Sequence, residues 1–154
     1  VFDKKQRCSF SKEEFKDLSY INKEDIIEKI WGKYVYIKSN KASSQVEVVI
    51  DSTGKLPFFY YPIPDGNILF SSDIELIFRA LSQKPEINWT YLCSYLIYGN
   101  SCAIQTPFQN IYELPPGCSL TFTRNTWTTK PFWDPLSIYK TSSFQERDAV
   151  EVLQ

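Results

Sequence analysis

The sequence of 154 residues contains no histidine and no methionine. Without histidine the chain lacks the commonest general base and the commonest zinc ligand, and it cannot form a Ser-His or Cys-His nucleophile pair by itself. Because position 1 is valine and no methionine occurs anywhere, we expect the chain to be a piece of a longer protein with a natural start upstream.

The four cysteines form no Cys-x-x-Cys pair of the kind that holds structural zinc. They are Cys8, Cys93, Cys102 and Cys118. A chain of this length buries a core without disulfides, so we expect buried free thiols in a cytoplasmic protein. No apolar run approaches the ~20 residues of a membrane span, and the given sequence shows no signal-peptide pattern. The net charge of −1 offers no attraction to nucleic acid or an anionic membrane, so we expect neither as a partner.

Aromatic residues make up 16% of the chain, and many lie in segments that favour β-strands. We expect strands at residues 33–38, 45–51, 56–61, 68–72, 118–124 and 127–133. In the first, Tyr34 and Tyr36 should face one side, and Val35 and Ile37 the other. The first four strands would form one antiparallel meander with a hairpin turn at residues 64–67.

Helix-capping residues and apolar periodicity predict five helices. These would cover residues 12–18, 23–31, 73–82 and 88–98, and a last helix would begin after Ser143. Ser72 and Glu75 would form a capping box, whereas Asn88 would cap the fourth helix and Gly99 would end it. The apolar sides would be Ile26, Ile27 and Ile30 in the second helix and Ile74, Ile77, Phe78 and Leu81 in the third.

Several singled-out residues have plain structural explanations. Asp51 should hydrogen-bond the turn amides near Thr53 and Gly54, and Asp73 with Glu75 fits the start of a helix rather than a metal site. Glu113 should be structural, with contact to a neighbouring domain as the alternative. The four tryptophans should pack on the sheets, although a peptide groove remains open.

The motifs VIDSTGKLPFFYY (49–61), LFSSDIELIFRAL (69–81), FQNIYELPPG (108–117) and PFWDP (131–135) occur in this order. Together they resemble the N-terminal glutaminase-like domain of asparagine synthetase-type enzymes, which carries RDxxGxxPLYY, FASEIKALL, GIxxLPPG and YWDP. The resemblance runs from about Ser11 to the helix at Ser143. The WGKYV segment (31–35) and the SSDIELI segment also look like the homologues that act as lasso-peptide cyclases.

The resemblance implies an α+β fold, namely a fragment of the four-layer αββα sandwich of glutamine amidotransferases of type 2, an N-terminal-nucleophile hydrolase fold with mainly antiparallel strands. Residues 1–136 would form a glutaminase-like domain whose front part is missing. Residues 137–143 would be a linker, and residues 144–154 would begin the first helix of a following ATP-dependent synthetase domain. The open sheet edges of such a fragment invite a companion chain or self-association.

Working members of that family use an amino-terminal cysteine with its own α-amine as base, and an aspartate that holds the ammonium group of glutamine. Val1 is no nucleophile, and Ser11 falls at the position of that aspartate, where a serine supplies no charge. We therefore expect no catalytic residue, no cofactor site and no metal site within this chain.

The leading hypothesis is a non-catalytic glutaminase-like domain of an asparagine synthetase-like, ATP-dependent amide ligase, in particular a lasso-peptide macrocyclase that forms an isopeptide bond. The parent enzyme would use ATP and Mg²⁺, by resemblance. Its partners would be a downstream ATP-pyrophosphatase domain or companion chain and a precursor peptide. The alternatives are a truncated glutaminase domain of a glutamine-hydrolysing asparagine synthetase, and a free-standing protein- or peptide-binding module.

Overall fold

The computed structural model describes residues 23–40, 42–81, 84–99, 104–124, 126–134 and 136, together with the backbone of 2–3 and 8–9. The elements are β1 (Phe2–Asp3), β2 (Cys8–Ser9), α2 (Lys23–Lys29), β3 (Ile30–Trp31), β4 (Val35–Asn40), β5 (Gln45–Ile50), β6 (Phe59–Pro62), β7 (Ile68–Ser71), α3 (Ile74–Ala80), α4 (Trp89–Tyr98), β8 (Tyr112–Glu113), β9 (Cys118–Thr123) and β10 (Thr126–Pro131). Every strand pair in this part of the chain is antiparallel.

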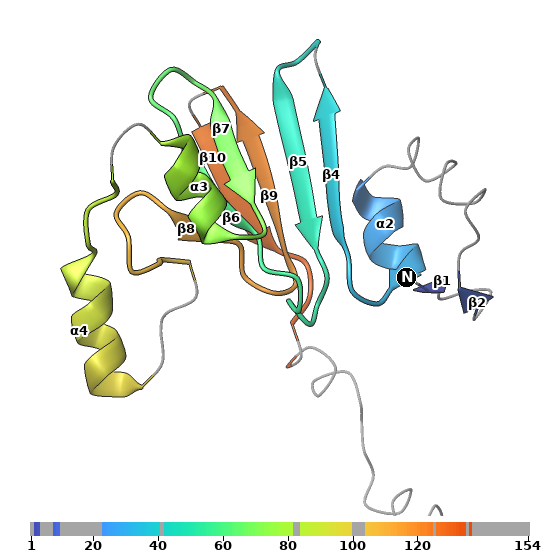
Figure 1. The fold of residues 1–154 in the computed structure, drawn as a ribbon. Helices are drawn as coiled ribbons and strands as arrows, with labels where there is room; N and C mark the ends of the chain where they lie inside the picture. The colour runs from blue at the N-terminus through green and yellow to red at the C-terminus, as the bar shows by residue number, and fades with distance from the viewer. Residues whose placement is uncertain are drawn as a thin grey trace, which may run out of the picture.

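Two larger sheets and one small sheet organise the strands (Figure 1). The first large sheet has the order β10-β9-β5-β4, the second has the order β7-β6-β8, and the small one pairs β2, β1 and β3. The prediction of a single four-strand meander is wrong, because β5 and β6 belong to different sheets. The chain turns at Asp51–Gly54, where Gly54 has φ +58°, and crosses to the second sheet before β6 begins at Phe59.

The main core lies between the two large sheets. Alternate residues of β5 and β9 point inward and meet the inward side chains of β6 and the residue after β8. The buried members of this core are Val48, Ile50, Phe58, Tyr60, Leu114 and Leu120. Burying such side chains is the dominant favourable term in folding, so this sandwich is what holds the described chain together.

Two helices cover the outer faces of the large sheets. Helix α2 contacts β5, and its Ile26 packs with Ile30 against Tyr34 and Tyr36, while Val35 turns toward the main core. This confirms the predicted alternation along the first strand. The predicted helix end is wrong by two residues, because Ile30 leaves α2 and pairs with Asp3 in the small sheet.

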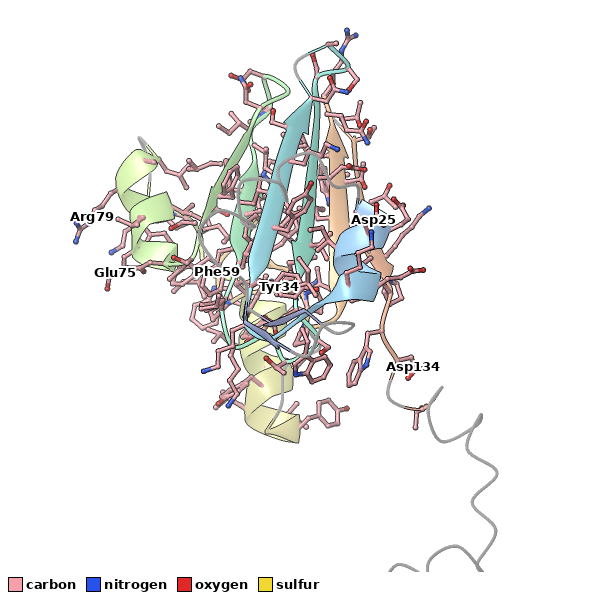
Figure 2. The ribbon with its side chains drawn as sticks, turned by 90° about the vertical axis from the view of Figure 1, so that its right-hand side faces the viewer. Asp25, Tyr34, Phe59, Glu75, Arg79 and Asp134 are labelled. Carbon is pink, nitrogen blue, oxygen red and sulfur yellow. The ribbon has the colours of Figure 1, made fainter. Side chains whose placement is uncertain are left out.

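Helix α3 contacts β6 and β7 and has the predicted apolar side, with Ile77 fully buried. The predicted capping box is wrong in its details. Asp73, not Ser72, is the N-cap, and its carboxylate accepts a hydrogen bond from the Glu75 amide at 2.9 Å. Glu75 instead reaches Arg79, 3.8 Å away on the solvent side of the helix (Figure 2).

Helix α4 confirms the predicted bounds. Asn88 accepts a hydrogen bond from the Tyr91 amide at 3.1 Å, and Gly99 ends the helix in the left-handed conformation. The helix projects from the sandwich on the side of β8 (Figure 1), and none of its residues is buried.

Some predictions fall outside the described residues. These are the helix at 12–18, the linker at 137–143 and the helix after Ser143. Among the described helices, none is both long and apolar enough to cross a membrane.

Candidate functional site

The carboxylate of Asp51 lies at the turn that follows β5. We call this turn, with the residues that pack on it, the Asp51 corner; its members are Asp51, Thr53, Gly54, Pro116, Gly117, Phe132 and Trp133. Only 1% of this residue is exposed, yet each oxygen is hydrogen-bonded. Oδ1 accepts from the amides of Thr53 at 2.8 Å and Gly54 at 3.2 Å and from the Thr53 hydroxyl, and Oδ2 accepts from the Tyr34 amide at 3.2 Å. The predicted bond to the turn amides is confirmed. Asp51 thus ties the residue before β4 to the end of β5.

Three motifs that carry the family resemblance meet at this corner. The Asp51 carbonyl accepts a hydrogen bond from the Gly117 amide at 3.0 Å, and the Gly117 carbonyl accepts one from Phe132 at 2.9 Å. Gly54 lies so close to the prolines of the LPPG turn that a Cβ would be 2.4 Å from Cγ of Pro116. Described residues of the DSTG, LPPG and FWDP motifs therefore pack together at this corner.

The ionisable neighbours of the corner are held in their uncharged forms. Burial, followed by the charge of Asp51, raises the pKa of the Tyr34 phenol to about 12. Burial also raises the pKa of the half-buried Cys118 thiol, which makes it a weaker nucleophile at neutral pH.

Outside the corner, the described residues bring together no three side chains of the types that ligate metals. Cys93 and Cys118 are both free, but Cys93 is exposed on α4, so the prediction of buried thiols is wrong for it. Ser11 lies outside the described residues. Burial raises the pKa of Glu113, which pairs with Phe59 across the second sheet.

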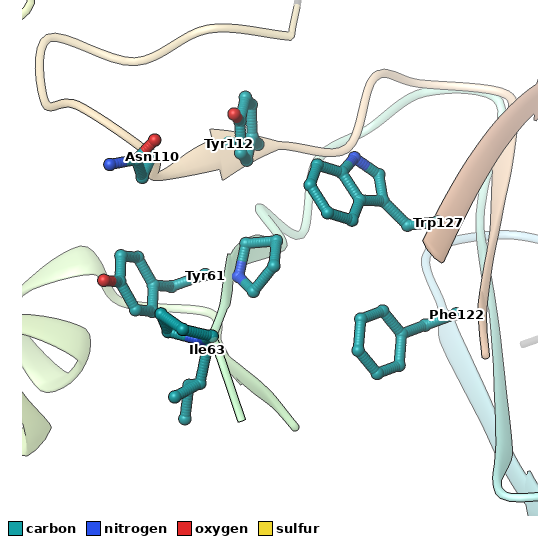
Figure 3. Close-up of a pocket in the computed structure, with 8 residues that line it drawn as sticks. Tyr61, Ile63, Asn110, Tyr112, Phe122 and Trp127 are labelled. Carbon is teal, nitrogen blue, oxygen red and sulfur yellow. The ribbon is translucent and has the colours of Figure 1, made fainter. Parts of the chain in front are cut away.

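A pocket with four aromatic side chains in its wall is lined by residues of both large sheets (Figure 3). We call it the aromatic pocket. Its cavity measures about 360 Å³, and its rings come from Tyr61, Tyr112, Phe122 and Trp127. The remaining wall is formed by residues 62–64 of the β6–β7 hairpin and by Asn110. None of the described residues that line it is charged.

The tryptophans fall into different environments. Trp127 tilts against Tyr112 in the aromatic pocket, with ring centroids 6.0 Å apart, and Trp133 packs on Gly117 at the corner. Trp89 is 67% exposed on α4, so the prediction of sheet packing is wrong there. The sequence did not reveal the pocket, because its wall joins four segments that are separate in the chain.

The family model of the glutamine amidotransferase domain matches residues 19–133. No curated protein matches the chain. The matched range contains the Asp51 corner, both large sheets and the helices α2, α3 and α4. Because the match spans most of the sequence, the chain belongs to the glutamine amidotransferase domain family.

Proposed function

We propose that this chain is a glutaminase-like domain that does not hydrolyse glutamine and that serves as the structural partner of an ATP-dependent amide-forming domain of asparagine synthetase type. The observation that carries the proposal is the Asp51 corner. There the retained family motifs pack on one another, and the described residues hold no group of three metal-ligating side chains.

Ser11 supports the loss of glutamine hydrolysis. In the family an aspartate at this position binds the ammonium group of glutamine, and a serine hydroxyl lacks the charge for that role. A protein that uses an amine of its own substrate as nucleophile needs no ammonia, so such a site has no function to preserve. Lasso-peptide cyclisation, in which a side-chain carboxylate is joined to an N-terminal amine, is the reaction of this kind that the sequence resemblance favours.

The order of layers supports the family fold. Helix α2 lies on the first large sheet, the main core joins the two large sheets, and α3 lies on the second. We take this as part of a four-layer αββα sandwich. In the proposed enzyme, residues 1–136 form this domain, residues 137–143 the linker and residues 144–154 the first helix of the synthetase domain.

ATP and Mg²⁺ do not fit the residues of this chain. The sequence contains only five glycines and no phosphate-binding loop, and the described residues hold no cluster of metal ligands. The N-terminus of α4 is already occupied by the Asn88 cap. The proposal therefore assigns the nucleotide site to the synthetase domain, in a cytoplasmic enzyme.

The test uses the full-length parent protein. Ammonia release from glutamine is measured beside pyrophosphate release from ATP in the presence of candidate carboxylate peptides. We expect pyrophosphate release that depends on the peptide, and no ammonia above the heat-inactivated control. Ammonia release at the rate of pyrophosphate release would contradict the proposal and favour a glutamine-hydrolysing asparagine synthetase.

A substitution tests the assignment of Ser11 directly. Ser11→Asp restores the carboxylate that the family uses, and Ser9→Asp adds the same charge two residues away. We expect only the first variant to gain affinity for glutamine in calorimetry. Equal behaviour of the two variants would show that Ser11 does not occupy the glutamine-binding position. Absence of any ATP-dependent activity in the parent would leave the free-standing binding module as the better account.

A further inference from the structure

We propose that the aromatic pocket binds an extended peptide segment of another polypeptide through a prolyl residue. The inference rests on the walls of the pocket and does not depend on the proposed ligase function. It assigns a ligand to a cavity that combines aromatic rings with hydrogen-bond donors.

The walls select a flat, uncharged and apolar group. Four aromatic rings line it, Pro62 and Pro64 add rigid apolar surface, and no acidic or basic side chain is among the described residues of the lining (Figure 3). A volume of about 360 Å³ lies at the lower end of the range of ligand pockets, which suits one or two side chains. Grooves lined by aromatic residues are the common recognition surface for proline-containing segments.

The polar groups of the wall suit a peptide backbone. The side-chain amide of Asn110 and the indole N–H of Trp127 are hydrogen-bond donors that have no hydrogen-bond partner among the described residues. A polyproline II segment has carbonyl groups without internal hydrogen bonds, so it offers acceptors at regular intervals. Donors beside ring faces therefore bind the carbonyls while the rings hold the prolyl side chain.

The pocket is formed before any ligand arrives. Tyr112 stacks on Tyr60 with ring centroids 5.4 Å apart, and Phe122 at the base is only 4% exposed. The hairpin wall is held by the Ile63 amide, which donates to the Asn67 carbonyl at 2.9 Å. A rigid site loses little conformational entropy on binding.

Access comes from the sheet edges. Strand β10 lies at one edge of the first large sheet, and β8 lies at one edge of the second, in the described part of the chain. Tyr112 and Trp127 belong to these two strands, and Trp127 is 41% exposed. The rings of these two residues tilt against each other with centroids 6.0 Å apart, so a ligand approaches over the exposed part of Trp127 rather than between the two strands.

The experiment titrates the chain with an acetylated decaproline peptide and follows the four tryptophan indole N–H signals by NMR. Each signal is assigned by substituting its tryptophan. We expect the Trp127 signal to shift, and a Gly-Ser peptide of equal length to leave it unchanged. Trp127→Ala should weaken decaproline binding about tenfold or more, as removal of a central aromatic anchor does, whereas Trp89→Ala on exposed α4 should not.

Asn110→Gly keeps the test valid if Trp127→Ala fails to fold. Asn110 has φ +62°, which glycine adopts freely, so the substitution removes the side-chain donor without backbone strain. Loss of one hydrogen bond should weaken binding by about threefold to tenfold. The proposal is overturned if decaproline does not bind, if the Gly-Ser peptide binds equally well, or if both pocket variants bind decaproline as the unmodified chain does.

Discussion

Helices α3 and α4 are consecutive in the chain and are both apolar and capped, but they differ in what they touch. Helix α3 contacts β6 and β7 and buries Ile77 completely, whereas α4 buries none of its residues. Leu96, Ile97 and Tyr98 at the end of α4 are each more than 70% exposed. Apolar composition therefore does not distinguish the two helices, and contact with the sheets does.

The two helices are anchored differently. Phe78 of α3 meets Phe108 edge to face, with ring centroids 4.6 Å apart, in addition to the sheet contacts. Helix α4 is tied at its start, where the Asn88 amide donates to the Pro107 carbonyl at 2.8 Å. A ten-residue helix is marginal in water without packing. Its caps and its first turn consequently carry more of its stability than those of α3.

Shortening a buried side chain should separate the two helices most strongly. Ile77→Ala leaves a cavity against the second sheet and should lower the free energy of unfolding by about 2–5 kcal/mol. Leu96→Ala, at a residue that is 81% exposed, should change it by about 0.5 kcal/mol or less. Urea denaturation measures both. Equal destabilisation would show that α4 is packed as firmly as α3.

The next largest difference should appear at two glycines with the same backbone conformation. Gly54 and Gly99 have φ +58° and +67°, but a Cβ at Gly54 would meet Pro116, and one at Gly99 would meet nothing within 4 Å. Gly99→Ala should cost about 1–2 kcal/mol of left-handed strain. Gly54→Ala should cost roughly 1–3 kcal/mol more, because the added Cβ would overpack the corner against Pro116. Similar melting temperatures for the two variants would contradict close packing at the corner.

Local signals in the sequence predicted helix α4 well. The bounds of α4 follow from Asn88 and Gly99, and the alternation of Tyr34 and Tyr36 with Val35 follows from the period of a strand. These features depend on neighbours within a few residues. The same local rules placed the cap of α3 one residue too early, because a serine and an aspartate at adjacent positions are both good caps.

Features that depend on distant segments could not be predicted in this way. The chain order suggested one meander, but β5 pairs with β9, which lies about seventy residues later, and β6 pairs with β8. The aromatic pocket was missed for the same reason, since Tyr61 and Trp127 meet only after both sheets form. At the Asp51 corner, the hydrogen bonds from the Asp51 carboxylate to the turn amides were predicted, but the hydrogen bond from the Gly117 amide to the Asp51 carbonyl was not.

Removing the helix caps should produce a smaller and more local difference. Asn88→Ala and Asp73→Ala each lose one side-chain acceptor, worth about 1 kcal/mol. In α3 the sheet contacts remain, so amide hydrogen exchange of its buried turn should change little. In α4 exchange should accelerate over the first two turns. Uniform acceleration in both helices would mean that the caps matter equally, and would remove the distinction in anchoring.

The smallest effect is expected at Glu113, which lies between the second sheet and the segment that follows α4. Glu113 pairs with Phe59 of β6, and its backbone amide donates a hydrogen bond to the Ile104 carbonyl at 2.9 Å. Burial raises the pKa of this carboxyl above its ordinary 4.5, so the folded chain holds the proton more tightly than the unfolded one. Stability should therefore fall slightly as the pH rises from about 4.5 through the raised pKa. Glu113→Gln should abolish this part of the decline and stabilise the chain at neutral pH, as measured by urea denaturation across pH. Parallel profiles for the two proteins would show that the carboxylate is solvated, and that the boundary between sandwich and α4 is open to water.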